Sequence, residues 1–282
     1  MTLDESYAYC EKVARRRARN FYYAFVLLSK DRRRAMCAIY AFMRYCDDLS
    51  DDEGLSNRAG AIGRWKQDLA AALEGRFSGH PVWPAFHDAV TRYAIPHCYF
   101  FEMIEGVSSD LEPRRIRTFD ELYRYCYLVA SVVGLTIIHI FGFESDQALP
   151  LAEKCGIAFQ LTNILRDIRE DAARGRVYLP EEDLARFGVS QGTFVNVEIS
   201  AGFTALMEYE VDRAEAYYQA SMPLVRLVNP GSRPSLGALI EIYHRLLKRI
   251  QEARRDVLSR RIHIPAWEKI FIILRWRIHR IP

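Results

Sequence analysis

Four aspartates form two pairs of identical spacing, Asp47 with Asp51 and Asp167 with Asp171. On a helix, residues four apart project side by side from one face, about 6 Å apart along the axis. A lone acidic pair of this kind usually belongs to a solvated face or a ladder of salt bridges. Two such pairs, each at the end of a strongly apolar helix, favour a shared chemical role.

If both pairs faced one cavity, their carboxylates would repel one another unless cations joined them. Magnesium takes oxygen ligands and commonly bridges a carboxylate to substrate phosphates. The spacing therefore predicts a magnesium–diphosphate site, and Gln160 and Asn163 share a helical face with Asp167. Zinc is not indicated, because no set of His and Cys residues has suitable spacing.

Arginines flank both acidic pairs. Arg44 lies one turn before the first pair, Arg166 adjoins the second, and Arg174 and Arg176 follow it. A guanidinium binds phosphate through its planar fork, and a departing diphosphate needs such charge because its oxygens become more anionic. The alternative role for these arginines is a salt bridge to the same aspartates. This alternative is a serious one for Arg169 and Arg174, and a weaker one for Arg176, which lies in an irregular segment.

Helix-period patterns recur along the whole chain, separated by short breaks. The predicted helices span about 4–19, 31–51, 58–75, 82–94, 96–110, 119–141, 146–172, 191–228, 235–259 and 265–279. No alternating strand pattern persists, and no linker divides the chain. The sequence therefore predicts one all-α domain over residues 1–282.

The composition narrows the class of protein. Half of the 282 residues are hydrophobic, which is enough for a sizeable core, and a net charge of +3 does not indicate a nucleic-acid binder. The six cysteines form no metal-ligand spacing, so we expect buried free thiols in a reducing cytoplasm. The first twenty residues are polar and charged, which does not indicate a signal peptide. The expected location is therefore cytoplasmic.

Two apolar segments bear on membrane contact. The run from Leu128 to Phe143 is shorter than the roughly 20 residues of a membrane span, and we expect a buried core helix. Residues 270–280 mix bulky apolar side chains with arginine. Such a segment either lies on a membrane surface or packs on the body as a terminal helix, and the sequence leaves both open.

The chain resembles the squalene/phytoene synthase family over most of its length, closest to bacterial presqualene diphosphate or phytoene synthases. Three motifs in the correct order carry the resemblance: Tyr40–Asp51, Tyr125–Gly134 and Gln160–Pro180. The resemblance implies the isoprenoid synthase fold, an all-α bundle of long helices around a central cavity. It also implies a transferase of isoprenoid biosynthesis, leading to carotenoids or hopanoids.

The same resemblance implies roles for individual side chains. Two or three magnesium ions would be held by Asp47, Asp51, Asn163, Asp167 and Asp171. Diphosphate would be bound by Arg44, Arg166 and Arg176, with Tyr40, Tyr243 and Arg260 or Arg261 as weaker candidates. The central tunnel would be lined by Tyr125, Val129, Val133, Gly134 and Gln160.

One segment departs from the family pattern. The family often carries a Ser-x-Ser-Phe motif near its N-terminus, whose hydroxyls contact diphosphate, and here the stretch reads Ala18-Arg-Asn20-Phe21. Asn20 can still form hydrogen bonds and Arg19 adds charge, so substrate binding by Asn20 and Phe21 is expected, with altered diphosphate contacts.

The family chemistry implies head-to-head condensation of two prenyl diphosphates. Loss of one diphosphate leaves an allylic cation, which the second double bond attacks before proton loss closes a cyclopropane. An apolar tunnel would keep water from the cation. Tyr125 is the first candidate to stabilise the cation through its ring and to relay the proton, with Tyr127 and Phe21 next.

The substrate is predicted to be farnesyl diphosphate, giving presqualene diphosphate or squalene, and geranylgeranyl diphosphate giving phytoene is the alternative. Use of NADPH stays open, although no GxGxxG fingerprint is present. Head-to-tail prenyltransferases and terpene cyclases usually have differently spaced aspartates. A non-catalytic binding or assembly factor on this scaffold would have lost aspartates that are all present here. We expect a monomer or a weak homodimer.

Overall fold

The computed structural model describes residues 1–52, 54–111, 115–196 and 200–278. Side chains are described in these ranges except at residues 19–21, 51, 196, 254 and 255. The first part of the chain forms α1 (Leu3–Arg17), α2 (Arg19–Phe25), α3 (Lys30–Asp51), α4 (Arg58–Leu73), α5 (Trp83–Arg92) and α6 (Cys98–Ser109).

The middle of the chain forms α7 (Phe119–Cys126), the π-helical turn η1 (Tyr127–Ser131), α8 (Val132–Phe141), α9 (Ala148–Ala173) and α10 (Glu181–Arg186). The last part forms α11 (Gly192–Asn196), α12 (Ala201–Ser221), α13 (Leu224–Leu227), α14 (Arg233–Ala253), the 3₁₀ turn η2 (Arg254–Leu258) and α15 (Ala266–Ile278). Across the described ranges, β structure is limited to two isolated bridges. The all-α class is confirmed, and the single domain over residues 1–282 stays a prediction.

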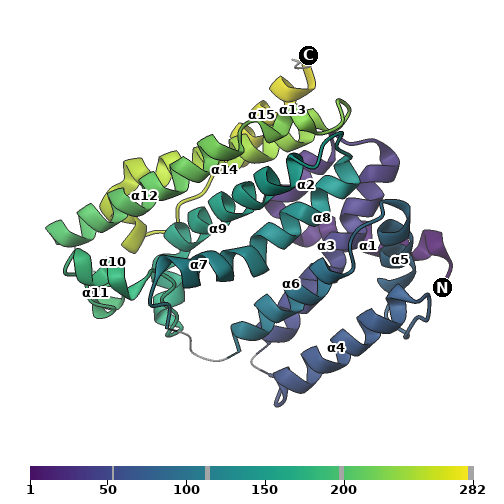
Figure 1. Ribbon diagram of the computed structural model, residues 1–282, viewed down its shortest axis with the longest axis horizontal. Coiled ribbons are helices and arrows are strands. Elements are labelled where there is room, and N and C mark those ends of the chain that lie inside the picture. Colours follow the sequence, from purple (N-terminus) through teal and green to yellow (C-terminus); the bar gives the residue numbers. More distant parts are fainter. Residues whose placement is uncertain (53, 112–114, 197–199, 279–282) are drawn as a thin grey trace.

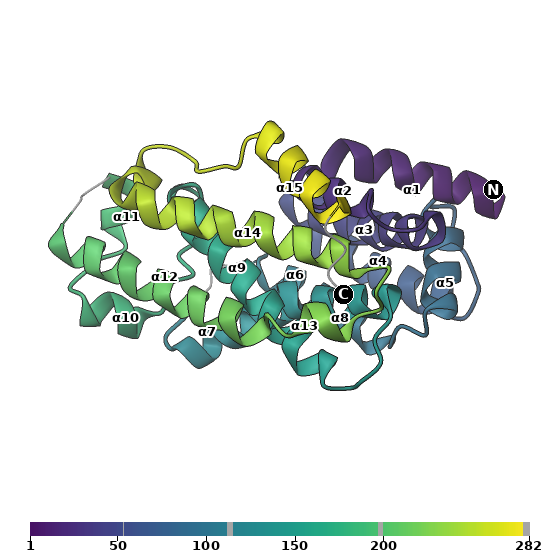
Figure 2. The same ribbon diagram turned by 90° about the horizontal axis from the view of Figure 1, so that it is seen from above.

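Long helices lie side by side across the molecule (Figure 1). Helix α9 packs against α12, α8, η1 and α14, and on the other side of the cavity α3 packs against α1, α4, α5 and α6. Seen from above, α14 and α12 run next to one another along one edge (Figure 2). The resulting bundle encloses the space between α3, α8, α9 and α14.

Helix α3 is held in place by its apolar stripe. Ala35, Ile39, Phe42 and Cys46 recur at i, i+4, i+7 and i+11 in the sequence, a spacing that predicts one apolar face of a helix, and all four are fully buried. Phe42 contacts a cluster of aromatic rings, with its ring centroid 4.6 Å from that of Phe86. Burying each such aromatic side chain is worth about 1.5–3 kcal/mol, so α3 is firmly fixed against the helices around it.

The structure adds two short helices that were not predicted, α2 and α10, ends the predicted helix 235–259 in the 3₁₀ turn η2, and interrupts two other predicted helices. The predicted helix 191–228 is divided, because the Ser200 hydroxyl accepts from the amide of Phe203 at 3.0 Å and so begins a separate helix, α12. The helix predicted over 119–141 contains the π turn η1.

The free thiols are confirmed, but only five of the six are buried, because Cys98 is exposed on α6.

Close backbone packing positions η1. A Cβ on Gly156 of α9 would lie 2.5 Å from the Cα of Ser131, and one on Gly106 of α6 would lie 3.0 Å from the backbone of Leu128. Only glycine permits this approach at both positions. The helical run Phe119–Phe141 has the length and composition of a membrane span, so it is longer than the segment Leu128–Phe143, which is too short to span by itself. More than half of its most apolar window is buried inside the protein, which agrees with the core helix predicted for Leu128–Phe143.

Candidate active site

Two cavities that share part of their lining lie next to one another, the first between α3, α8, α9 and α14 and the second between α3, α6, α7, η1 and α9. We call the first the apolar chamber, a cavity of about 270 Å³ whose lining includes Phe25, Met36, Ile138, Leu224, Leu236 and Leu239. We call the second the polar chamber, a cavity of about 380 Å³ that includes Asp110, Tyr125, Arg166, Asp167, Asp171, Arg174, Arg176 and Tyr178. The boundary residues that line both are Met43, Arg44, Asp47, Val129, Val133, Gln160 and Asn163.

Helices α3 and α9 run in the same sense along these chambers. On α3 the lining passes from Met36 through Tyr40 to Asp47, and on α9 from Cys155 to Asp167. The C-terminal ends of both helices therefore lie at the polar chamber. Because a helix carries partial negative charge at its C-terminus, these ends favour cations in addition to the carboxylates they bear.

The structure brings together three of the four predicted aspartates. Asp47, Asp167 and Asp171 all line the polar chamber. The side chain of Asp51 is outside the described residues, although its backbone ends α3. Burial raises the pKa of Asp171 to about 6, with a further contribution from the Asp167 carboxylate and opposition from Arg176. The chamber thus concentrates negative charge that a cation would relieve.

The donor atoms present fit a magnesium–diphosphate cluster. Asn163 Oδ1 is buried without a hydrogen-bond partner, while its Nδ2 donates to Gln160 Oε1 at 3.4 Å. Such an oxygen beside carboxylates suits a hard cation. In the described part of the chain, no three acidic, His or Cys side chains lie close enough to hold a metal by themselves. Magnesium often completes its coordination with substrate phosphates, so this arrangement is compatible with it.

Asp167 is presently paired with arginines. Arg166 donates to it through two nitrogens, one at 2.8 Å, and Arg261 Nε lies 2.9 Å from Asp167 Oδ1. Of the alternatives Arg260 and Arg261, only Arg261 therefore contacts the aspartate motif, since Arg260 pairs with Asp256 at 3.2 Å. A diphosphate that entered this chamber would replace the Asp167 carboxylate as the partner of Arg166 and Arg261, whose guanidinium groups are already held in place.

The other predicted diphosphate ligands line one or both of the chambers. Arg44 pairs with Asp48, and its buried Nε has no hydrogen-bond partner. Arg176 donates to the carbonyl oxygen of Asp110 at 3.1 Å. Tyr40 and Tyr243 line the apolar chamber rather than the polar one. Their position favours contact with a prenyl chain near its diphosphate.

The π turn places the predicted tunnel residues on one face. Tyr125 and Val129 line the polar chamber together with Val133, and Gly134 lines the apolar chamber. On an ideal α-helix, residues at successive spacings of four drift by about 40° each time. The wider turn of η1 offsets this drift, and π turns of this kind are frequent at functional sites.

Tyr127 lies elsewhere. Its hydroxyl donates to Glu102 at 3.1 Å, and Arg124 covers its ring. It lines neither chamber, so its proposed role beside the cation is not supported. The side chains of Asn20 and Phe21 are outside the described residues.

Sequence reasoning missed two members of the polar chamber. Asp110 accepts hydrogen bonds from the hydroxyls of Tyr125 and Tyr178, both at 3.1 Å, and the two rings stack 4.8 Å apart. Burial, then the charge of Asp110, raises the pKa of Tyr125 well above its usual value. Tyr178 falls inside the quoted motif Gln160–Pro180 and could have been found there. Asp110 is merely the last residue of the helix predicted over 96–110 and carried no such signal.

An apolar chamber that opens onto carboxylates and arginines is the site expected of an enzyme acting on isoprenoid diphosphates. The sequence model of the squalene/phytoene synthase family matches residues 14–268. The 15-cis-phytoene synthase of Synechococcus elongatus is 35% identical, over 95% of this chain and 91% of its own. The phytoene synthase of Arthrospira platensis is 33% identical, over 96% of this chain and 92% of its own.

Solved structures agree with the sequence comparison. A dehydrosqualene synthase in complex with ligand superposes with a TM-score of 0.89 at 28% identity, covering 98% of this chain and 97% of that one. The squalene synthase HpnC from Alicyclobacillus acidocaldarius gives a TM-score of 0.83 at 27% identity, covering 89% and 94%.

This chain belongs to the squalene/phytoene synthase family. It has the isoprenoid synthase fold and is a prenyl transferase that condenses prenyl diphosphates head to head, in a family that generally uses divalent metal with these substrates.

Proposed function

We propose that this enzyme condenses two molecules of geranylgeranyl diphosphate to phytoene. The observation that carries the proposal is the likeness to phytoene synthases, at 33–35% identity over nearly the whole chain in the two cyanobacterial relatives. The farnesyl substrate that the sequence favoured is not confirmed by these relatives. The dehydrosqualene and squalene synthases of known structure are less similar, at 28% and 27% identity.

The apolar chamber supports a long prenyl chain. Its lining follows α3 from Asp47 to Met36, which is about 16 Å of helix at 1.5 Å per residue. Beside it, the rings of Phe159 and Tyr243 stack in parallel with centroids 4.3 Å apart. We propose that this chamber holds the apolar tails, excludes water from the cation and presents aromatic faces to it.

Diphosphate binding is assigned to the polar chamber. Arg44, Arg166 and Arg176 are proposed to bind its oxygens. Magnesium is proposed to be held by Asp47, Asn163, Asp167 and Asp171, with Asp51 as the fifth predicted ligand. When bound with diphosphate, magnesium supplies positive charge that stabilises the leaving group. The three arginines would donate hydrogen bonds to the same oxygens. The negative charge that develops on the departing diphosphate would therefore be stabilised by both the metal and the arginines.

Proton transfer is assigned to Tyr125. Its raised pKa keeps the phenol neutral, and its oxygen lies at the edge of the polar chamber beside Asp110. The phenol oxygen would accept the proton that the cation loses, while releasing its own proton to Asp110 or to the departing diphosphate. Tyr178, stacked on Tyr125 and bonded to the same carboxylate, would hold the ring in place.

The test is a product analysis with purified protein and magnesium. We expect phytoene from geranylgeranyl diphosphate without NADPH, and a kcat/KM for farnesyl diphosphate lower by at least about tenfold, a modest difference for apolar discrimination. Preferred turnover of farnesyl diphosphate to presqualene diphosphate or squalene would contradict the proposed substrate. Asp167→Asn is the matched control, and product formed at the normal rate by this variant would contradict the site assignment.

A further inference from the structure

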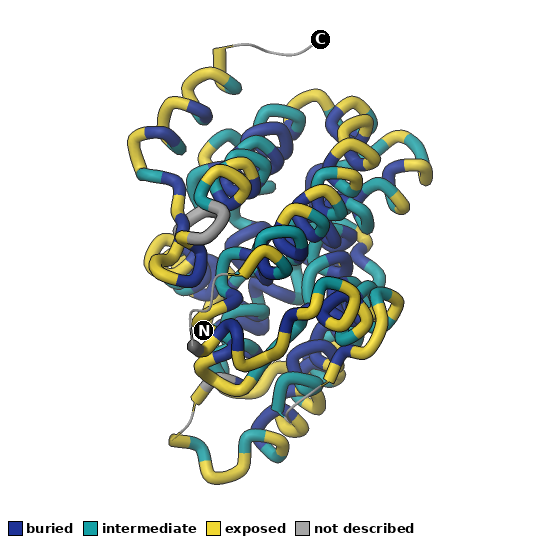
Figure 3. Tube along the Cα trace, turned by 90° about the vertical axis from the view of Figure 1, so that its left-hand side faces the viewer, coloured by how far each residue is buried: buried dark blue, intermediate teal, exposed yellow. Residues whose placement is uncertain are grey.

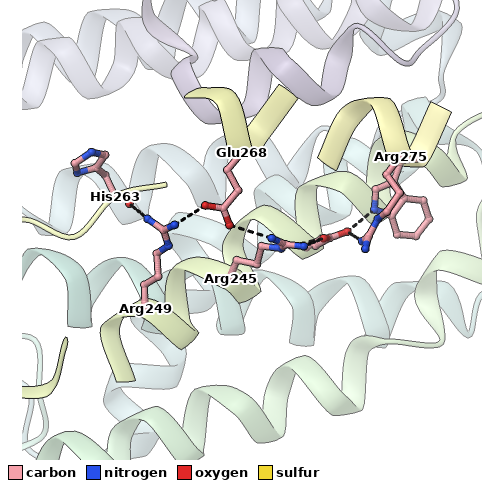
Figure 4. Close-up of polar contacts among 7 residues, drawn as sticks. Arg245, Arg249, His263, Glu268 and Arg275 are labelled. Atoms are coloured by element: carbon pink, nitrogen blue, oxygen red, sulfur yellow. Dashed lines mark hydrogen bonds and ion pairs between the residues drawn. The ribbon is translucent and has the colours of Figure 1, made fainter. Parts of the chain in front are cut away.

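Helix α15 is fixed to α14 by a network of ion pairs (Figure 4). Glu268 is buried and accepts from Arg245 at 3.0 Å and also from Arg249. Glu241 of α14 accepts from Trp276 Nε1 at 2.7 Å and pairs with Arg275. Carboxylates on both helices are therefore used to clamp them together.

Close packing adds to this clamp. Ile272 is fully buried against Ala238 and Ile242 of α14. The ring of Trp276 lies so close to Gly237 that a Cβ there would come within 2.2 Å of it. The rotation of α15 about its own axis is thus set, and its opposite face must point away from the protein.

That opposite face is apolar. Five apolar side chains on this face are each 47–75% exposed, and together we call them the outer face of α15: Trp267, Ile270, Phe271, Leu274 and Ile278. Their spacing of i, i+3, i+4, i+7 and i+11 places them in a stripe about 100° wide. They make up five of the eleven exposed large hydrophobic side chains in the described ranges. Figure 3 shows α15 as the outermost layer of the bundle.

The charges around the stripe are basic. Arg275 and Arg277 are exposed and project about 80° to either side of its centre on a helical wheel, and of the two Arg275 is also paired with Glu241. Lys269 lies on the opposite side of the helix, over the ring of Tyr23, and the one acidic residue of α15, Glu268, is buried and faces two arginines of α14. A stripe of Trp, Phe, Ile and Leu flanked by arginines is typical of helices that lie in a membrane interface.

The position of α15 matches a lipid partner. It packs on α14 and α2, and these helices supply Leu236, Leu239 and Phe25 to the lining of the apolar chamber. Docking of the outer face would bring a bilayer next to the wall that holds the prenyl tails.

We propose that α15 is a membrane-docking helix, whose outer face inserts into the headgroup layer of a bilayer that contains anionic lipid. The proposal concerns where the enzyme works and is independent of which prenyl diphosphate it uses. Apolar side chains would supply the insertion, and the flanking arginines would supply attraction to anionic headgroups that weakens with added salt.

Flotation with lipid vesicles tests this proposal. The full chain should float with vesicles of phosphatidylcholine plus phosphatidylglycerol, and less with phosphatidylcholine alone. The triple variant Trp267→Gln, Phe271→Gln, Leu274→Gln should lose at least about tenfold in partitioning, since each replaces a buried apolar contact with the lipid. The control Phe77→Gln, Val195→Gln, Met222→Gln removes as many exposed apolar side chains elsewhere and should bind as the wild type does.

Charge is tested separately, by a variant that leaves the stripe intact. Arg277→Glu should weaken binding to anionic vesicles while leaving binding to neutral vesicles unchanged, and Arg64→Glu on α4 is its exposed control. Turnover of soluble substrate in detergent checks that all variants are folded.

The fluorescence of Trp267 can report how deeply α15 enters the bilayer. Trp65 and Trp83 are buried and Trp276 is half-buried, so Trp267, at 69% exposure, should dominate quenching by brominated lipid. Absence of quenching, equal flotation of the outer-face variant and its control, or a dimer in solution that the outer-face variant dissociates would each overturn the proposal. The last result would assign the face to a second copy.

Discussion

At the scale of single residues, the acidic end of α9 shows how a site can be recognised before its ligand is seen. Arg166 and Arg261 already neutralise Asp167, but Asp171 is half-buried near other carboxylates and has its pKa raised to about 6. Asn163 Oδ1 is buried without a partner in the same chamber. Both features are costly in the free protein, and both suit a bound cation.

The pKa of Asp171 leads to a prediction about stability without metal. A carboxyl whose pKa is raised in the folded state contributes stability below its unfolded pKa, and this contribution is lost as the pH rises through about 6. In the presence of a chelator, Asp171→Asn should therefore have a higher Tm than the wild type at pH 7.5. The difference should shrink as the pH falls towards 4.

Thermal melts between pH 4 and pH 7.5 measure this directly, with Asp212→Asn as control because the Asp212 side chain is exposed on α12 and lines neither chamber. A Tm advantage for Asp171→Asn that stayed constant over this range would contradict the titration argument.

How much of the site was predictable depends on whether a residue's role was visible in its own motif. The two aspartates of each pair could be predicted to lie side by side because helical spacing puts them on one face, and Arg166 could be predicted because it adjoins Asp167 in the sequence. Asp110 could not, since it joins Tyr125 and Tyr178 only through the folding of α6 against η1 and the loop after α9. The ion pair of Arg261 with Asp167 likewise joins segments that are far apart in the sequence.

At the scale of elements, η1 depends on glycines whose importance the sequence did not indicate. The buried stripe of α3 was predictable because periodicity reports burial directly. The π turn was not, because it results from the contact of η1 with α6 and α9 rather than from its own residues. Gly106 and Gly156 permit that contact, and both were unremarked positions in predicted helices.

Substitution at Gly156 tests this role. In Gly156→Ala the new Cβ would meet the backbone of Ser131 and Ala130 at 2.5–2.9 Å, so η1 must move. We expect a loss of about 1–3 kcal/mol in the free energy of unfolding, as for other overpacked cores. Turnover should fall as well, because η1 carries Val129 into the chambers.

The control is Gly63→Ala in α4, where nothing lies within 4 Å of the added Cβ. There, the gain in helix propensity should stabilise the protein by up to about 1 kcal/mol. Urea denaturation of both variants gives the comparison, and a Gly156→Ala variant as stable as Gly63→Ala would contradict the close-packing account.

At the scale of the whole molecule, the site joins segments that are far apart in the chain. Helix α3 is anchored by α1, α4, α5 and α6, whereas α9 is anchored by α12, α14 and α8, and their acidic C-terminal ends both reach the polar chamber. Without a ligand, like charges oppose each other across this chamber. A magnesium–diphosphate cluster bound to both ends would turn that repulsion into a cross-link between them.

Such a cross-link should appear as cooperative stabilisation by the two ligands. Ligand at about 100 times its Kd adds about 2.7 kcal/mol, which in a protein of this size raises Tm by about 5 °C or more. We expect this shift with magnesium and inorganic diphosphate together, and much less with either alone, because the aspartates need the metal and the metal needs the phosphate oxygens. Asp47→Asn on α3 and Asp167→Asn on α9 should each abolish the joint effect, although they lie on different helices. If only the α9 variant abolished it, the cluster would rest on one helix, and the bridging of α3 to α9 would be wrong even though metal binding stood.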